Sequence, residues 1–199
     1  MAFFRLVPNL VIMAPKDFKE LEDMLEFAVG LGKPVVIRYP RGGEDSIKFE
    51  KHEKISLGQA EVIQQGKDIS IIAIGKMVSR AMRVAEKLKE KNIEAEVINT
   101  RFLKELDRET IKKSIVKTKY VITIEDGTII NGLATAVKEL IVDEKIEDIC
   151  MQTYAYPDKF IKHGTVQELE KIYEMDEKSI ISKIDFEHLK NRVEEKIDE

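Results

Sequence analysis

Short apolar segments alternate with segments of helical periodicity along most of this chain, and this alternation limits the possible folds more than any other feature. The apolar run at residues 10–14 precedes Asp17, which forms with Glu20 the D-x-x-E pattern typical of a helix start. Apolar residues then recur at helical spacing as far as Gly30, and residues 35–38 form a second strand-like run. Strand, helix and strand in this order predict a crossover unit between parallel strands.

This first unit is too small to enclose a core by itself, so we expect it to continue a domain whose earlier part precedes residue 1. Residues 43–56 are charged and lack a clear period, which favours an extended linker. A second alternating pattern begins at Leu57. Its expected elements are a strand at 58–65, a hairpin turn at 65–68, a buried strand at 69–74, a helix carrying Val78 to Leu88 on one face, a strand at 95–99, a helix from Asp107 to 117, a strand at 120–125, a helix at 130–142, a strand at 146–153 and a short helix started by the T-x-x-E cap at 165–168.

The whole pattern predicts an α/β fold with a mostly parallel sheet and one antiparallel hairpin strand. The charged residues 194–199 are expected to form a frayed surface helix or a tail.

Composition narrows the class of function. The formal net charge is -4, which argues against nucleic acid as the main partner. No apolar run is long enough for a membrane span, and the N-terminus lacks the order of a signal peptide, so we expect a cytoplasmic protein. The single cysteine, Cys150, excludes an internal disulfide, and its apolar surroundings near the end of a predicted strand favour an inert core thiol over a nucleophile.

Few residues suggest chemistry. The sequence contains no glycine-rich phosphate loop, no Cys/His cluster for zinc and no G-x-S-x-G elbow. His52, His163 and His188 are far apart, and we interpret them as surface or structural residues rather than ligands. Glu125-Asp126-Gly127 follows a predicted strand, where paired carboxylates could form an acid/base or metal pair, or simply a turn. We favour the turn.

The segment R-Y-P-R-G-G at residues 38–43 places two guanidinium groups at a strand end, followed by a flexible corner. Such geometry suits the capture of an anion, because the fork of Arg matches the oxygens of a phosphate or carboxylate. An exit loop with solvated arginines is the alternative, and these six residues alone favour it.

An ordered set of short motifs resembles the C-terminal third of the 1-deoxy-D-xylulose-5-phosphate synthase family. The motifs are V-P-N-L-V-I-M-A-P-K-D (7–17), K-P-V-V-I-R-Y-P-R-G (33–42), S-L-G-Q-A-E-V (56–62), I-I-A-I-G-K-M-V (71–78), V-I-N-T-R-F-L-K-E-L-D (97–107), Y-V-I-T-I-E-D-G (120–127) and Y-P-D-K-F-I-K-H-G (156–164). The resemblance implies residues 1–45 as the end of a pyrimidine-binding domain, 46–56 as a linker and 57–199 as a transketolase C-terminal-like domain. That domain would have three layers, a mostly parallel sheet and one antiparallel strand.

The resemblance also implies an activity. Family enzymes are homodimers that join pyruvate, after decarboxylation on thiamine diphosphate, to glyceraldehyde 3-phosphate, a step of isoprenoid precursor synthesis that also serves thiamine and pyridoxal synthesis. Three parts of the family site precede the segment that matches Met1: the Mg²⁺ and pyrophosphate site, the Glu that activates the aminopyrimidine, and the substrate-contacting Asp and His. The resemblance therefore implies no catalytic, cofactor-binding or metal-binding residue here, no bound cofactor and no activity of this chain alone.

The resemblance implies a role in substrate binding for one residue of this chain. The second arginine of R-Y-P-R-G contacts the acceptor phosphate in the family, which assigns substrate binding to Arg41 and leaves Arg38 a structural role. Transketolase and the decarboxylase β-subunits do not normally carry this motif. The chain departs from the family at Glu105, where proline is usual, and at residues 131–135, where a glycine-rich stretch is usual. Two alternatives stay open: a subunit of a split transketolase-like enzyme, and a stand-alone binding or scaffolding module.

Overall fold

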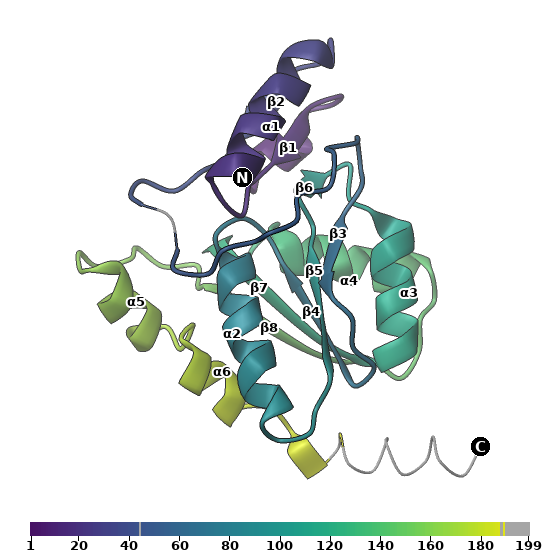
Figure 1. Cartoon of the computed structure of the whole chain (residues 1–199), viewed down its shortest axis with the longest axis vertical. Helices are drawn as coiled ribbons and strands as arrows, with labels where there is room; N and C mark the ends of the chain where they lie inside the picture. Colours follow the sequence, from purple (N-terminus) through teal and green to yellow (C-terminus); the bar gives the residue numbers. More distant parts are fainter. Residues whose placement is uncertain (44, 188, 190–199) are drawn as a thin grey trace.

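The computed structural model describes residues 1–43, 45–187 and 189, and it contains a small and a large sheet (Figure 1). The small sheet lies in the upper part of Figure 1, near the N-terminus, and has the strand order β2-β1-β6. The large sheet has the order β3-β5-β4-β7-β8. The charged residues 194–199 and His188, both interpreted above, lie outside the described residues.

The N-terminal unit is the crossover that the sequence predicts. After a short 3-10 helix, η1 (Phe3–Leu6), strand β1 (Val11–Met13) leads into α1 (Phe18–Gly30) and then β2 (Val35–Ile37). The Asp17 side chain caps α1 by accepting a hydrogen bond from the Glu20 N–H at 2.7 Å. Strands β1 and β2 pair in parallel, which confirms the predicted connection.

The third strand of the small sheet comes from the other end of the sequence. Strand β6 (Phe102–Lys104) pairs antiparallel with β1 and was not expected. It brings the Phe102 side chain into a buried cluster with Val11, Met13 and Met24. Because β6 belongs to the second half of the chain, it fastens the N-terminal unit to that half through backbone pairing.

The large sheet consists of β3 (Glu61–Gln64), β4 (Ile69–Ala73), β5 (Ala95–Asn99), β7 (Tyr120–Thr128) and β8 (Cys150–Tyr156). Strand β3 is antiparallel to β5, and the other pairs are parallel, as the mixed pattern predicts.

The predicted hairpin between β3 and β4 is wrong. Strand β5 lies between them, so residues 65–68 cross the end of β5. Gly66 passes directly against that strand: a Cβ here would lie 2.2 Å from the carbonyl carbon of Ala95. The N–H groups of Lys67 and Asp68 donate to the carbonyl of Glu94 at 3.1 and 3.0 Å. Glycine is therefore needed for close backbone approach rather than for a hairpin turn.

Helices cover both faces of the large sheet and give three layers (Figure 1). On one face lie α2 (Met77–Lys89), α5 (Val166–Ile172) and α6 (Glu177–Ser182), and on the other α3 (Arg108–Thr118) and α4 (Leu133–Asp143). The expected α/β fold is confirmed, although α6 was not foreseen. None of the helices in the described ranges is long and apolar enough to cross a membrane.

Two elements begin later than the sequence predicts, because residues before them adopt the left-handed backbone conformation. The strand expected at 146–153 begins only at Cys150, because Lys145 and Asp148 have φ values of 50° and 58° and keep the preceding residues in turns. The helix expected from residue 130 begins at Leu133, after Asn131 at φ 54°. Residues 45–56 contain no helix or strand, yet Ile55 is buried against the small sheet.

Candidate functional site

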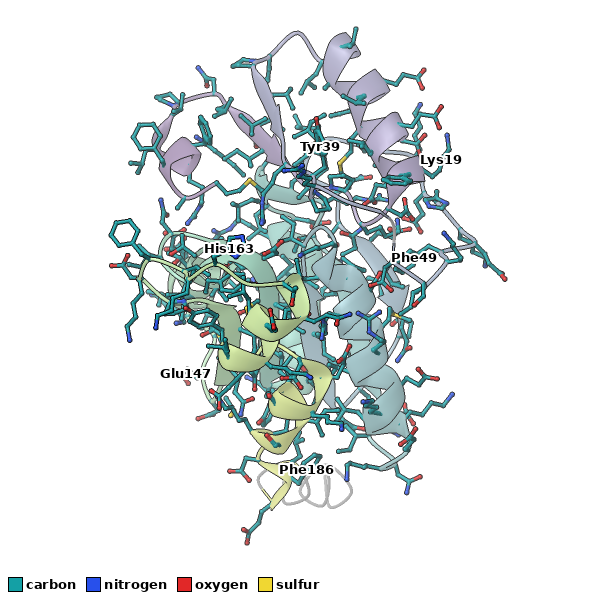
Figure 2. All side chains as sticks on the ribbon, turned by 90° about the vertical axis from the view of Figure 1, so that its left-hand side faces the viewer. Lys19, Tyr39, Phe49, Glu147, His163 and Phe186 are labelled. Atoms are coloured by element: carbon teal, nitrogen blue, oxygen red, sulfur yellow. The ribbon has the colours of Figure 1, made fainter. Side chains whose placement is uncertain are left out.

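The R-Y-P-R-G-G segment leaves the small sheet at its end and runs into solvent. The Arg38 N–H donates to the carbonyl of Met13 at 2.9 Å, which continues the parallel pairing of β2 by one residue. Tyr39 and Arg41 are exposed, and Tyr39 is labelled on the upper, N-terminal part of the molecule (Figure 2). Gly42 has a φ of 127°, which L side chains rarely adopt, so glycine is required at this corner.

Arg41 lies exposed on this segment, and no ion pair or hydrogen bond joins its side chain to another residue in the described part of the chain. An unpaired guanidinium on a strand-end loop can bind a phosphate bidentately. The phosphate contact itself stays a prediction.

Arg38 and Lys76 share one carboxylate. The Nη2 of Arg38 lies 3.3 Å from Oδ2 of Asp126, and the Nζ of Lys76 lies 2.9 Å from the same oxygen. Arg38 follows β2, Asp126 lies in β7 and Lys76 immediately precedes α2. The half-buried Asp126 therefore ties the crossover unit to the large sheet.

Glu125 and Asp126 do not form the turn that we favoured from the sequence. Both lie in β7, which continues to Thr128, and the Glu125 carboxylate is buried at the start of α4. Its Oε1 accepts a hydrogen bond from the Ala134 N–H at 3.3 Å. A Cβ at Gly132 would lie 2.3 Å from that oxygen, so the glycine makes room for the carboxylate.

Burial raises the pKa of Glu125 to about 7, although backbone N–H groups of Ala134 and Leu133 and the cations Arg38 and Arg5 act in the opposite direction. A carboxyl group with a pKa in this range can exchange a proton near neutral pH. The turn interpretation failed because the burial of Glu125 depends on a helix that begins eight residues later in the sequence.

Beneath the segment lies a small hollow of about 50 Å³. Its walls come from the start of α1, the R-Y-P-R-G-G segment and the residue before α2. The lining residues are Pro15, Lys16, Asp17, Phe18, Leu21, Tyr39, Pro40, Gly43, Asp45 and Lys76.

A buried network of charges joins the N-terminal unit to the large sheet, and one of its members, Lys16, also lines this hollow. Lys16 Nζ lies 3.1 Å from Glu20 Oε1 and 2.7 Å from Glu61 Oε2. Arg101 Nε lies 2.8 Å from Glu20 Oε1, and Arg101 Nη2 lies 3.1 Å from Glu61 Oε2. Two cations face two carboxylates, and the Asn99 amide donates to Glu20 at 2.9 Å, so the buried charges are balanced and hydrogen-bonded.

Sequence reasoning missed this network. Bonded members of the network are as far as 81 residues apart, and no local spacing marks them. The only available signal was Arg101 itself, a charged residue between two apolar strands in the V-I-N-T-R-F motif.

The remaining candidates are dispersed. The Nε2 of His52 lies 2.7 Å from Oδ2 of Asp17, the residue that caps α1. His163 lies on the exposed loop before α5 (Figure 2). Cys150 begins β8 and is only partly buried, rather than ending a strand. Among the described residues, no group of three or more His, Cys, Asp or Glu side chains could hold a metal ion.

The fold and these motifs define the class of protein. The family described as the transketolase C-terminal domain matches residues 58–180, and the chain belongs to this family.

Curated relatives agree with the resemblance seen in the motifs. The chain is 40% identical over 183 residues to the 1-deoxy-D-xylulose-5-phosphate synthase of Caldanaerobacter subterraneus, an alignment that covers 92% of this chain and 29% of the relative. It is 43% identical over 164 residues to the synthase of the same name from Desulforudis audaxviator, covering 82% and 26%. The chain therefore spans less than a third of the length of these relatives.

Solved structures support the fold. A chain described as "Split gene transketolase, inactive beta4 tetramer" superposes with a TM-score of 0.83 at 29% identity, covering 91% of this chain and 58% of the other. The transketolase of Campylobacter jejuni superposes with a TM-score of 0.66 at 14% identity, which supports the fold alone.

Proposed function

We propose that this chain is the C-terminal portion of a 1-deoxy-D-xylulose-5-phosphate synthase. The parent enzyme would join pyruvate to glyceraldehyde 3-phosphate with thiamine diphosphate and Mg²⁺. The observation that carries the proposal is the R-Y-P-R-G-G segment at the end of β2, in a chain 40% identical to such synthases over 92% of its length. Arg41 is exposed on this segment and has no ion-pair partner among the described residues. In this proposal residues 1–45 belong to the pyrimidine-binding domain, 46–56 to a linker and 57–199 to the C-terminal domain.

The described residues of this chain do not fit the cofactor. The described part offers no cluster of metal ligands, and the sequence has no glycine-rich loop for a pyrophosphate. We therefore assign thiamine diphosphate and Mg²⁺ to other parts of the parent enzyme and derive no step through them. What this chain would supply is a cation for the acceptor phosphate, together with the domain that supports it.

Replacing Arg41 tests the proposal. Arg41→Ala should weaken the binding of glyceraldehyde 3-phosphate by about tenfold, since a charge-assisted bond to an anion contributes about 1.5 kcal/mol or more. Binding is followed through the amide NMR signals of residues 38–43 during titration. The matched control is Arg108→Ala, which removes an exposed arginine from α3. If Arg41→Ala and the unsubstituted chain bind glyceraldehyde 3-phosphate equally well, the substrate-binding role of Arg41 is rejected. A binding or scaffolding module of another kind is then favoured.

A direct assay tests inactivity. We expect no product when the purified chain is mixed with pyruvate, glyceraldehyde 3-phosphate, thiamine diphosphate and Mg²⁺. Turnover by the chain alone would contradict the assignment of the catalytic groups to other parts of the parent enzyme.

A second candidate function is a subunit of a split enzyme. It is favoured by the TM-score of 0.83 with a chain described as a split gene transketolase. A separate polypeptide carrying the cofactor site would then co-purify with this chain and restore activity. For the first candidate we propose a homodimeric parent enzyme, and for both candidates we propose a cytoplasmic location.

A further inference from the structure

Little holds the R-Y-P-R-G-G segment between its ends. Residues 39–43 form no backbone hydrogen bond with other residues in the described part of the chain. The two glycines at 42 and 43 add backbone freedom, and a Cβ at either position would meet no atom within 4 Å. Contacts at the two ends of the segment therefore contribute to the position of Arg41, together with Tyr39 and Pro40, which line the hollow beside the start of α1.

At the upstream end, Arg38 is fixed by its backbone and its side chain. The backbone N–H bonds to Met13, and the side chain reaches across to Asp126 on β7. Lys76 holds the same Asp126 oxygen from the start of α2, so Asp126 is itself restrained by a second element. Asp126 thus fixes Arg38, which is the last residue before Arg41 with a backbone hydrogen bond to the small sheet.

At the downstream end, Asp45 forms an ion pair with Arg83 of α2, with 2.6 Å between Oδ1 and Nη1. Burial raises the pKa of Asp45, but hydrogen bonds from Arg83 and the Ile47 N–H outweigh it and lower the pKa below its ordinary value. Arg83 is fixed in turn by Glu177 of α6 at 2.6 Å. Both ends of the segment are thus attached by ion pairs to elements that pack on or within the large sheet.

The pairing also separates the roles of the two arginines. Asp126 forms an ion pair with Arg38, which lies at the end of strand β2, whereas Arg41 has no anionic partner among the described residues. An incoming phosphate would therefore meet Arg41 as the uncompensated cation.

We propose that Asp126 is a positioning residue for Arg41: by holding Arg38, it orients the R-Y-P-R-G-G segment so that the second arginine is presented to the ligand phosphate. This inference rests on the proposed function for its ligand, but the restraint itself can be measured without one. Asp126 lies within residues 58–180, which match the transketolase C-terminal domain. That domain would therefore contribute to substrate binding by positioning Arg41.

The first arm of the test needs no ligand. Limited trypsin digestion of the whole chain, followed by mass spectrometry, measures the rate of cleavage of the peptide bond between Arg41 and Gly42. Asp126→Asn should be cleaved there about fivefold faster than the parent chain, since a partly buried ion pair contributes on the order of 1 kcal/mol. Asp126→Glu, which keeps the charge, should be cleaved at close to the parent rate. Asp158→Asn, on an exposed loop, is the matched control.

The second arm asks whether Asp126 acts through Arg41. The affinity for glyceraldehyde 3-phosphate is measured for the parent chain, Asp126→Asn, Arg41→Ala and the double variant. Asp126→Asn should change the affinity in the parent chain and leave it unchanged once Arg41 is absent. A general loss of folding would change both backgrounds equally, and thermal melts identify it.

The two proposals fail in different ways. An unchanged cleavage rate in Asp126→Asn, or an equal effect of this variant with and without Arg41, would overturn the positioning role. If Arg41→Ala leaves the affinity unchanged, the substrate-binding proposal falls, and the trypsin arm alone then decides whether Asp126 restrains the segment.

Discussion

At the scale of single residues, Glu125 makes the strongest prediction about pH. Its pKa is about 7 in the folded chain against an ordinary value of 4.5, so the folded state binds the proton more tightly than the unfolded state. The stabilisation is complete below about pH 4.5 and is lost as the pH rises through about 7. The side chain in Glu125→Gln carries no charge. This variant should therefore lack the pH-dependent decrease in the free energy of unfolding, which amounts to up to about 3 kcal/mol.

Urea denaturation at about pH 5 and about pH 8 measures this effect on the free energy of unfolding. The parent chain should lose more stability than Glu125→Gln between the two conditions. Glu22→Gln, on the exposed face of α1, is the matched control and should follow the parent chain. Parallel pH profiles for the parent and Glu125→Gln would show that Glu125 is ionised in the folded chain at both conditions.

Single residues also show what the sequence could predict about the site. The substrate-binding role of Arg41 stays a prediction that rests on its motif, and the exposure of Arg41 is a local property of a glycine-containing segment. The environments of Glu125 and Arg101 were not predictable, because a helix and a second sheet bury them through contacts between distant residues. The Asp126-Gly127 pair made Glu125 resemble a turn residue, and no local pattern assigned a role to Arg101.

At the scale of elements, segments with a helical period or a continuous apolar run were predicted well, and these include the three-residue strands β1 and β2. Strand β6 is equally short, but its residues Phe102, Leu103 and Lys104 form neither a longer apolar run nor a recognisable period of two. Strand order was also hidden: no local feature indicates that β5 lies between β3 and β4.

Two departures from the family pattern have a backbone explanation. Glu105 replaces the usual proline and has a φ of 70°, which a proline ring cannot adopt. Asn131 stands in the stretch that is normally richer in glycine. It has a φ of 54°, and its side chain donates to the Ala2 carbonyl at 2.7 Å. Asparagine tolerates this conformation better than most residues, and here its amide also fastens η1.

Strand β6 makes a prediction about how the two sheets are joined. Phe102→Ala should create a cavity beside Met13 and Met24, where Phe102 also meets the Phe27 ring edge-on at 6.2 Å. The free energy of local unfolding of the small sheet should fall by about 3 kcal/mol. Hydrogen exchange should then accelerate at the amides of β1 and β2 and much less at those of β4 and β7.

Phe160→Ala is the matched control for this experiment, since that phenylalanine is fully exposed on the loop before α5. It should leave the exchange pattern unchanged. Uniform acceleration across both sheets in Phe102→Ala would mean that the small and large sheets open as one cooperative unit.

At the scale of the whole molecule, the N-terminal unit leaves apolar surface uncovered. On α1, Leu25 is 51% exposed and Val29, one turn further, is 89% exposed. Strand β2 is the outer strand of the small sheet, with β1 as its sole neighbour in the described residues. Curated relatives are more than three times as long as this chain, so in a full-length synthase further polypeptide is available to cover these surfaces.

We therefore expect this chain to self-associate when it is purified alone, with a weight-average mass that rises with concentration. Leu25→Lys combined with Val29→Lys should shift the equilibrium towards the 22.9 kDa monomer, because two charges on one helical stripe oppose apolar contact. Sedimentation equilibrium measures the change. Phe160→Lys places a charge on the loop before α5 and serves as the control. If that variant alone dissociates the assembly, the contact surface includes the loop rather than α1. A monomer at every concentration would show that the exposed stripe of α1 is tolerated in solution without a partner.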